Sequence, residues 1–200
     1  MESKKALFLI NKPMNTTRRS YNTRVQLGAV WGNRSSHVID KQIVSALQTL
    51  HGNRCHEQEE VYYLYADSIR LVERGEGVLN TIVYDGSLLY QVTFTADVCT
   101  FPRGTKLTCA VLKRNEEGIL CRIKHACQTA STVESPFIVM LPIRWHPPKV
   151  QKTLRNMDMQ TDDVLHTQVL GSRFDPSNVS TMQIIVELDS NFDLLSSSSK

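Results

Sequence analysis

Apolar and polar positions follow two different periods along this chain of 200 residues. After residue 35 the apolar residues recur every three or four positions, a spacing that gathers them on one face of a helix. The residues on that face are Ile39, Ile43, Ala46, Leu47 and Leu50. We expect Ser35 or Ser36 to cap the start of this helix and Asp40 to lie near the positive end of its dipole. Gly52 is expected to end the helix in a left-handed conformation.

Beyond this helix the period falls to two, which is typical of β-strands. Strand-like segments occupy Val61–Tyr65 and Ile69–Glu73, and Arg74–Gly77 is expected to end the second of them. The clearest alternation places five apolar side chains on one face of a strand: Tyr90, Val92, Phe94, Ala96 and Val98. Together with a short strand at Arg24–Val30, this pattern predicts an α+β domain over residues 23–101, with one main helix on an antiparallel sheet.

Residues 102–190 have the pattern of a second, all-β domain. The segment Phe101-Pro102-Arg103-Gly104 marks the boundary, because Pro and Gly interrupt regular structure. Five strand candidates follow: Thr105–Lys113, Gly118–Ala126, Phe137–Ile143, Val164–Leu170 and Thr181–Leu188. Five short strands suit a small closed barrel of the OB-fold type, since closure removes exposed strand edges. Residues 144–163 form a long excursion from this barrel, residues 1–22 are predicted to be a flexible basic arm, and residues 191–200 a Ser-rich tail.

Composition narrows the classes of protein that the chain can belong to. Hydrophobic residues make up 41 % of the chain and charged residues 22 %, so a packed core is expected. No apolar run is long enough to span a bilayer, and the apolar patch near the start is too short for a secretory signal. The five cysteines form no C-x-x-C pair, which favours buried, reduced thiols. We therefore expect an intracellular protein without a membrane partner.

The formal net charge of +3 conceals four blocks of alternating sign. Residues 1–24 carry a net charge of +5 and residues 101–155 carry +7. Residues 25–100 carry −4 and residues 156–200 carry −5. Such blocks predict separate electrostatic surfaces rather than uniform solvation. The first domain is acidic and the start of the barrel is basic, which favours a protein partner for one and a nucleic acid for the other.

Residue patterns for catalysis or metal binding are weak. The segments His51-x3-Cys55-His56 and Cys121-x3-His125-x-Cys127 contain metal-ligating side chains, but neither has the paired spacing of structural zinc sites. Arg74-Gly75-Glu76-Gly77 lacks the lysine and the following helix of a phosphate-binding loop. We expect no enzymatic activity, no metal and no cofactor. A small hydrolase with a Cys–His nucleophile pair remains an open alternative.

Basic side chains of the predicted barrel are candidates for contacts with RNA. The candidates are Lys113, Arg114, Arg122, Lys124, Arg144 and Trp145. The first two lie at a predicted hairpin turn, and Arg122 and Lys124 share one face of the return strand. An OB-type barrel presents such a face to single-stranded nucleic acid, with cations on the phosphates and aromatic rings on the bases. Trp145 is the one well-placed aromatic residue. The alternative is a basic face that only contacts solvent.

A series of short motifs runs through the first domain in a fixed order: Val25-Gln26-Leu27, Trp31-Gly32, Glu73-Arg74-Gly75, Tyr84-Asp85-Gly86-Ser87, Val92-Thr93-Phe94-Thr95-Ala96-Asp97-Val98 and Pro102-Arg103-Gly104. The segment Ile184–Asp189 ends the last predicted strand of the barrel. In this order and spacing, residues 23–190 resemble the stalk subunit family of multisubunit DNA-directed RNA polymerases. That family comprises the seventh-largest subunit of RNA polymerase II and its counterpart in the archaeal enzyme.

The resemblance implies a non-catalytic, two-domain rod that works in transcription. Its first domain would dock on the core subunits of the polymerase near the clamp, and its barrel would meet nascent single-stranded RNA as the transcript leaves the enzyme. The residues at positions that match the docking tip are Trp31, Gly32, Arg70, Arg74, Gly75, Asp85 and Gly86. The family is usually paired with a second, helical stalk subunit, and whether this chain has that partner stays open.

The chain also departs from the family pattern. The arm at 1–22 and the excursion at 144–163 are additions, and many characteristic residues are replaced. Such divergence is typical of a member from a large DNA virus or a protist, which would place the protein in the nucleus or in the host cytoplasm and the virion. The alternative function is a stand-alone OB-fold protein that binds single-stranded RNA in translation or RNA processing.

Overall fold

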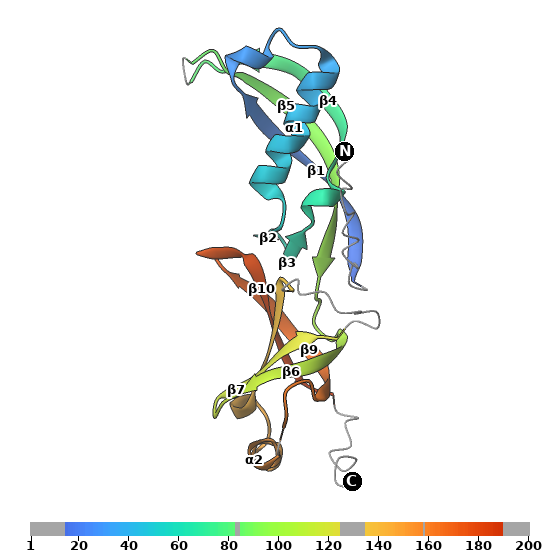
Figure 1. Cartoon of the computed structure of the whole chain (residues 1–200), viewed down its shortest axis with the longest axis vertical. Helices are drawn as coiled ribbons and strands as arrows, with labels where there is room; N and C mark the ends of the chain where they lie inside the picture. Colours follow the sequence, from blue (N-terminus) through green and yellow to red (C-terminus); the bar gives the residue numbers. More distant parts are fainter. Residues whose placement is uncertain (1–14, 83–84, 125–134, 158, 190–200) are drawn as a thin grey trace, which may run out of the picture.

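The computed structural model of the chain describes residues 15–82, 85–124, 135–157 and 159–189. These residues form a rod, with a helix-and-sheet unit at one end and a β-barrel at the other (Figure 1). The predicted fold class is therefore confirmed: a helix on an antiparallel sheet precedes an all-β, OB-like barrel. Neither α-helix in the described ranges is long and apolar enough to cross a membrane.

The first unit is a five-stranded antiparallel sheet with helix α1 on one face (Figure 1). Its elements are β1 (Thr16–Leu27), the 3-10 helix η1 (Ala29–Trp31), α1 (Ser36–His51), β2 (Arg54–Glu57), β3 (Val61–Leu64), the 3-10 helix η2 (Ala66–Ser68), β4 (Arg70–Leu79) and β5 (Leu88–Thr100). The strands lie in the order β1-β5-β3-β2, and β4 also pairs with β5. The long strand β5 is thus the centre of this sheet.

Strand β1 corrects part of the predicted organisation. It begins at Thr16 and pairs with β5 from Thr16 opposite Cys99 to Leu27 opposite Leu88. Residues 16–22, which the sequence placed in a flexible arm, are therefore ordered β-structure. The polarity of this stretch hid the strand, because even its inward positions Arg19 and Tyr21 are only half-buried.

Helix α1 has the predicted length, but its ends differ from the prediction. Ile39, Ile43 and Leu47 are buried against the sheet, as their spacing requires. Ser35 occupies the N-cap position without a side-chain cap bond, and its carbonyl accepts the backbone N–H of Ile39. Asp40 lies past the first turn, where it forms an ion pair with Arg74 at 2.7 Å instead of capping the dipole.

Gly52 ends the helix for a different reason from the one predicted. Its φ is −73°, and the left-handed conformation falls on Asn53, with φ 54°. A Cβ at residue 52 would lie 2.4 Å from the Cβ of Ala66 and 2.5 Å from the carbonyl oxygen of Gln48. Only glycine allows this close approach of the chain end to η2.

The break predicted at Arg74–Gly77 is a β-bulge within β4 rather than the end of the strand. The register between β4 and β5 shifts between Arg74 and Gly77, and pairing continues to Leu79. A Cβ at Gly77 would lie 2.7 Å from the ring of Tyr90, so glycine leaves room for this aromatic side chain. The bulge thereby keeps one continuous strand beneath α1.

Five strands of the second unit close into a barrel, as predicted. Its elements are β6 (Lys106–Arg114), β7 (Gly118–Ile123), β8 (Phe137–Pro142), the 3-10 helix η3 (Ile143–Trp145), α2 (Pro148–Asn156), β9 (Val164–Asp175) and β10 (Asn178–Leu188). They close in the order β10-β8-β7-β6-β9, and the pair β8–β10 is parallel. The predicted excursion at 144–163 contains α2. Leu154 of this helix is fully buried and belongs to the same apolar core as the barrel strands.

The two units share one apolar core at their junction. Successive side chains of β3 point to opposite faces, so Tyr62 and Leu64 pack beneath α1 while Tyr63 packs towards the barrel. The Phe137 ring contacts the Tyr63 ring edge-to-face at a centroid distance of 5.5 Å. It also contacts the Phe101 ring edge-to-face, at 5.1 Å. Because the core of the barrel continues into the sheet, we expect the rod to be stiff.

Candidate nucleic-acid interface

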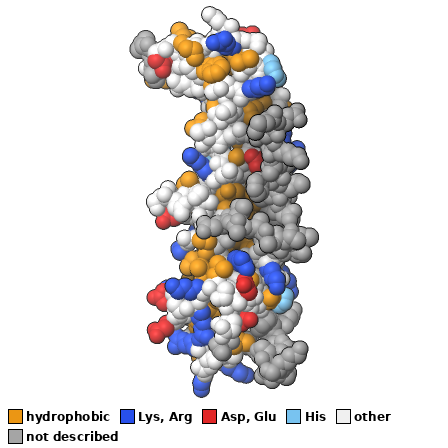
Figure 2. Space-filling model, viewed as in Figure 1, with side chains coloured by type: hydrophobic (Ala, Val, Ile, Leu, Met, Phe, Trp, Pro, Cys, Tyr) orange, Lys and Arg blue, Asp and Glu red, His pale blue; other side chains and the backbone are white. Residues whose placement is uncertain are grey.

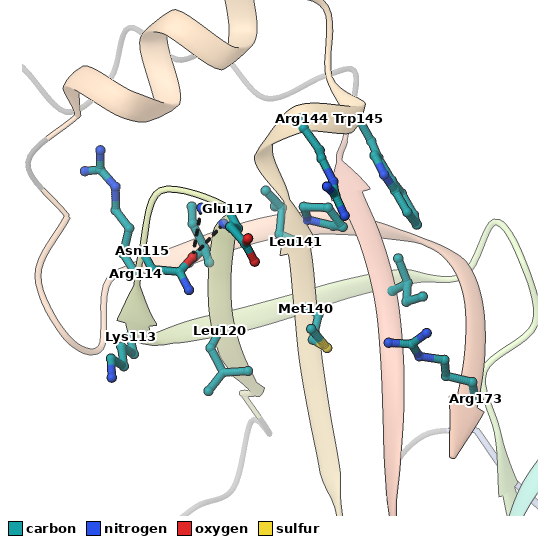
Figure 3. A pocket seen from close by; sticks show the side chains of 14 residues that line it. Lys113, Arg114, Asn115, Glu117, Leu120, Met140, Leu141, Arg144, Trp145 and Arg173 are labelled. Atoms are coloured by element: carbon teal, nitrogen blue, oxygen red, sulfur yellow. Dashed lines mark hydrogen bonds between the residues drawn. The ribbon is translucent and has the colours of Figure 1, made fainter. Parts of the chain in front are cut away.

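A pocket of about 360 Å³ lies on the outer face of the barrel, between the β6–β7 turn and η3 (Figure 3). Its volume falls within the usual range for small-ligand sites of about 300–1,000 Å³. Leu120 from β7, Met140 from β8 and Ile185 from β10 contribute apolar surface to it. The pocket is therefore an apolar depression built across three neighbouring strands.

The alternation of the strands explains why apolar side chains face outward here. Ile119, Val139 and Ile184 point into the barrel and are almost completely buried. Their neighbours in sequence, Leu120 and Met140 among them, must then point outward. These outward side chains are only half-buried, so the barrel offers apolar surface to a partner.

Charged and aromatic side chains surround this apolar floor. Lys113, Arg114, Arg144 and Arg173 carry positive charge, Glu117 carries negative charge, and Trp145 is 57 % exposed. In Figure 3 Arg144 and Trp145 project side by side from η3, and Arg173 reaches towards them from β9. A cationic rim beside an exposed indole is the combination that binds phosphates and stacks on bases.

Hydrogen bonds hold the two ends of the pocket together. Asn115 accepts the backbone N–H groups of Glu117 at 3.1 Å and of Gly118 at 2.8 Å, which shapes the hairpin turn (Figure 3). The N–H of Ile143 donates to the carbonyl of Glu117 at 2.9 Å, joining this turn to η3. Arg144 and Trp145 directly follow Ile143, so the turn and the aromatic end are fixed relative to each other.

The excursion after β8 positions Arg144 and Trp145. The side chain of Gln151 on α2 donates to the carbonyls of Arg144 at 3.2 Å and of His146 at 2.7 Å. The His146 ring bonds to the carbonyl of Pro142 through Nδ1 at 3.0 Å and accepts the N–H of Leu188 through Nε2 at 3.2 Å. Helix α2 and His146 thus anchor η3 to the end of β10.

The predicted RNA-binding residues divide into two groups. Lys113, Arg114, Arg144 and Trp145 line the pocket. Arg114 nevertheless donates to the carbonyls of Arg155 and Met157 at the end of α2, and in Figure 3 it points away from Trp145. The remaining two candidates, Arg122 and Lys124, are exposed at the end of β7 but do not line the pocket. Arg122 forms an ion pair with Asp162.

Sequence reasoning missed Arg173 and the apolar floor of the pocket. Arg173 lies near the end of β9, beyond the predicted strand Val164–Leu170, and its Nε donates to the side chain of Gln183 on β10 at 3.0 Å. The floor could have been found from the sequence. In each of their strands, inward and outward side chains alternate, and Leu120, Met140 and Ile185 lie at outward positions. A barrel whose outer face contacts only solvent would carry polar residues there.

Four of the predicted docking residues come together at the far end of the first unit. Trp31 and Gly32 end η1, and Asp85 and Gly86 precede β5. Gly86 has φ +73°, and a Cβ there would lie 3.2 Å from the Cβ of Ala29 in η1. The carboxylate of Asp85 accepts the Ser87 N–H at 2.9 Å, and hydrogen bonds from Ser87 lower the pKa of Asp85. The turn therefore packs directly on η1.

The other three predicted docking residues lie elsewhere and have structural contacts. Arg74 donates to Asp40 at 2.7 Å and to Ser36 Oγ at 2.8 Å, which fastens β4 to α1. Arg70, at the opposite end of β4 from the tip, donates to the carbonyls of Asp67 and Ile69. Gly75 lies in the β4 bulge, where a Cβ would be 3.5 Å from the carbonyl oxygen of Gln91.

Exposed aliphatic side chains at the same tip were not predicted. Val30, Val78, Leu79 and Ile82 are 57–85 % exposed. They come from η1 and from the end of β4 and the connection that follows it. In the view of Figure 2, hydrophobic side chains are exposed at the upper end of the rod, and Lys and Arg side chains gather over its lower end. We call Val30, Val78, Leu79 and Ile82 the apolar tip.

The predicted metal and nucleophile candidates gain no support from the geometry of the described residues. Cys121 is fully buried in the barrel, and burial raises the pKa of its thiol to about 12, so the reactive thiolate is scarce at neutral pH. His125 and Cys127 lie outside the described residues. Within those that are described, no three or more Asp, Glu, His or Cys side chains gather into a candidate metal site.

No model of a protein family and no curated protein matches this chain.

Proposed function

We propose that this chain is a non-catalytic stalk subunit of a DNA-directed RNA polymerase. Its apolar tip would dock on the polymerase core near the clamp, and its barrel would contact the emerging single-stranded RNA. The observation that supports the RNA contact best is the pocket in which exposed Trp145 stands beside Arg144 and Arg173 over an apolar floor. The order of motifs that resembles the stalk family supports the polymerase partner.

The chemistry of the pocket suits a single strand better than a duplex. Bases of a single strand are unstacked and free to lie on an indole ring, whereas bases in a duplex are stacked on one another. The cations of the rim would hold the phosphates on either side of such a base. OB-type barrels bind oligonucleotides on the face formed by their second and third strands, here β7 and β8.

The apolar tip supports a protein partner for the first unit. Single exposed apolar residues are common on protein surfaces, but here four exposed aliphatic side chains lie at one end of a small unit. Such apolar patches mark contacts with other proteins. Trp31, half-buried beside this patch, would add an aromatic anchor of the kind that dominates interface energies. Docking would stabilise the closed clamp only if the tip binds that state more tightly than the open one.

Affinity purification from the source cell tests this proposal. A tagged chain should bring down the large subunits of the polymerase. Ile82→Asp, which places a charge at the most exposed residue of the apolar tip, should remove them. Trp145→Ala serves as the matched control, because it alters the opposite end of the rod and should leave the polymerase bound.

Two results would contradict the proposal. If the unsubstituted chain binds RNA but never retains a polymerase subunit, a stand-alone RNA-binding protein becomes the better description. If Ile82→Asp and Trp145→Ala reduce recovery of the polymerase equally, the apolar tip is not the docking site.

A further inference from the structure

Glu117 is an unexpected residue in a pocket that would hold RNA. Four cations line the pocket, and Glu117 is the one carboxylate among its described lining residues. A carboxylate repels phosphates, so it would weaken a site that bound only the RNA backbone. Across the described ranges, the ion pairs include Arg18, Arg19, Arg74, Lys106 and Arg122 but none with Glu117. Among the described residues, no ion pair therefore ties the Glu117 carboxylate to one of these cations.

The backbone of Glu117 is held in place although its carboxylate is not. Its N–H donates to Asn115, and its carbonyl accepts the N–H of Ile143 at 2.9 Å. In Figure 3 the Glu117 side chain lies at the hairpin end of the pocket and Trp145 at the η3 end, with Arg144 between them in this view. A base stacked on Trp145 would therefore face the side of the pocket from which Glu117 projects.

Guanine is the base whose edge matches a carboxylate best. Its Watson–Crick edge presents two adjacent donors, N1–H and the N2 amino group, which two carboxylate oxygens can accept together. Adenine and cytosine each offer a single exocyclic amino group there, beside an acceptor that a carboxylate repels. Uracil offers one N–H between two carbonyls. A carboxylate opposite a stacking ring thus discriminates among bases.

We infer that the pocket binds one nucleotide of single-stranded RNA and favours guanine, with the base stacked on Trp145 and its Watson–Crick edge on Glu117. This inference rests on the proposed contact between the barrel and RNA. Arg144 and Arg173 hold the flanking phosphates in this arrangement. The pocket is then a base-selective site at the point where the chain meets the transcript.

Binding of short RNAs by the full chain tests the inference. The chain has two tryptophans, so a Trp31→Phe background makes Trp145 the only source of tryptophan fluorescence. The probes are oligouridylates carrying a single central guanosine or adenosine, together with guanosine monophosphate alone. We expect the guanosine probe to quench Trp145 and to bind about tenfold more tightly than the adenosine probe. The mononucleotide should bind much more weakly, because it lacks the flanking phosphates.

Glu117→Gln should reduce the preference for guanosine to about twofold or less, since an amide presents a donor where a second acceptor is needed. Glu116→Gln is the matched control. It removes the same charge from the same turn, but Glu116 does not line the pocket, so the preference should remain. A circular dichroism spectrum of each variant checks that the barrel is folded.

The outcomes separate this inference from the proposed function. Equal binding of the guanosine and adenosine probes with quenching of Trp145 would overturn base selection and leave RNA binding intact. Equal effects of the two glutamine variants on the preference would mean that Glu117 acts only through its charge and would overturn its contact with the base. If polyglutamate displaces the RNA probes as well as unlabelled RNA does, the pocket takes acidic polymers generally and selects no base. Absence of RNA binding at all would contradict the proposed function of the barrel.

Discussion

The two ends of the rod both expose apolar side chains, but they differ in what surrounds them. At the first end, the exposed residues of the apolar tip are aliphatic, and the turn beside them packs on η1. In the barrel, the apolar floor lies beneath an exposed indole and within reach of several cations. An aliphatic patch suits an apolar protein surface, whereas a floor with cations and an aromatic ring suits a nucleotide. Under the proposed function, the two ends would therefore contact different partners.

The two ends of the rod are expected to belong to one stiff body, and a substitution of Phe137 tests this expectation. Phe137→Ala should cost about 3–5 kcal/mol of stability, because it removes a buried ring that contacts both Tyr63 and Phe101. Urea denaturation is followed through Trp31 in a Trp145→Phe background and through Trp145 in a Trp31→Phe background. The two signals should report one common transition without the Phe137 substitution and two separate transitions with it.

Phe174→Ala is the control for the junction, since Phe174 is only half-buried at the edge of the same core. It should cost much less and leave a single transition. Two separate transitions in the unsubstituted chain would show that the units fold independently, and the rod would then be hinged.

The substitution Trp145→Ala tests whether the aromatic ring of the barrel binds RNA by base stacking. Removal of the stacking ring should weaken binding of single-stranded RNA by about 1–3 kcal/mol, whereas the dependence on salt should stay the same because the phosphate contacts remain. Binding of labelled oligouridylate at several salt concentrations measures both quantities. Trp145→Phe should restore part of the affinity, and an unchanged affinity in the alanine variant would exclude base stacking at this position.

Cations outside the pocket should matter less than those within it. Arg144→Glu should weaken RNA binding and reduce the salt slope by about 0.7 for each phosphate that the chain no longer neutralises. Arg122→Glu should have a smaller effect, because Arg122 lies outside the pocket and is paired with Asp162. Equal reductions in affinity for the two variants, measured in the same salt titration, would mean that RNA contacts the whole basic face.

Within the first unit, Arg74 should affect stability rather than docking. Arg74→Glu is expected to cost about 1–2 kcal/mol, since it removes the ion pair with Asp40 and the cation–π interaction with the Tyr90 ring at 5.4 Å. Thermal unfolding measures this cost, and the exchange Asp40→Arg with Arg74→Asp should recover part of it. Arg70→Glu, an exposed control on the same strand, should change stability by less than about 0.5 kcal/mol. An unstable Arg70 variant with a stable Arg74 variant would contradict this assignment.

The smallest expected effect is a pH dependence at the end of α1. Burial, followed by the charges of His56 and Arg54, lowers the pKa of His51 below its ordinary value of 6.5. The unfolded chain therefore binds a proton more readily, so stability should fall as the pH decreases through 6.5 and be unaffected by this group well above it. His51→Gln should flatten this dependence in urea denaturation, whereas His37→Gln, at an exposed position, should not.

The sequence predicted the fold where one side of an element is consistently apolar. The spacing of Ile39, Ile43 and Leu47 located α1, and the alternation of Tyr90 to Val98 located the central strand. Strand β1 was only partly found, because half of it is polar on both faces and depends on the free edge of β5. Gly52 was identified as the end of α1, but its reason, a close approach to Ala66, depends on a contact distant in sequence.

The candidate site was predictable in part for the same reasons. Lys113, Arg144 and Trp145 were found because cations and aromatic residues are conspicuous in a basic segment. The sequence grouped Arg122 with them, but it could not show that Arg122 lies outside the pocket, since its partner Asp162 is distant along the chain. Arg173 was missed because it lies on β9, distant in sequence from η3, and only the pairing of β9 with β10 brings it to the pocket.

Cross-linking of a nascent transcript in the purified polymerase complex tests the central claim most directly. A transcript carrying photoreactive uridines should cross-link to this chain in the barrel, at a peptide that includes Arg144 and Trp145, and the cross-link should disappear in Trp145→Ala. A cross-link confined to the helix-and-sheet unit, or a complex whose transcript never reaches this chain, would contradict the assignment of RNA to one end of the rod and the polymerase to the other.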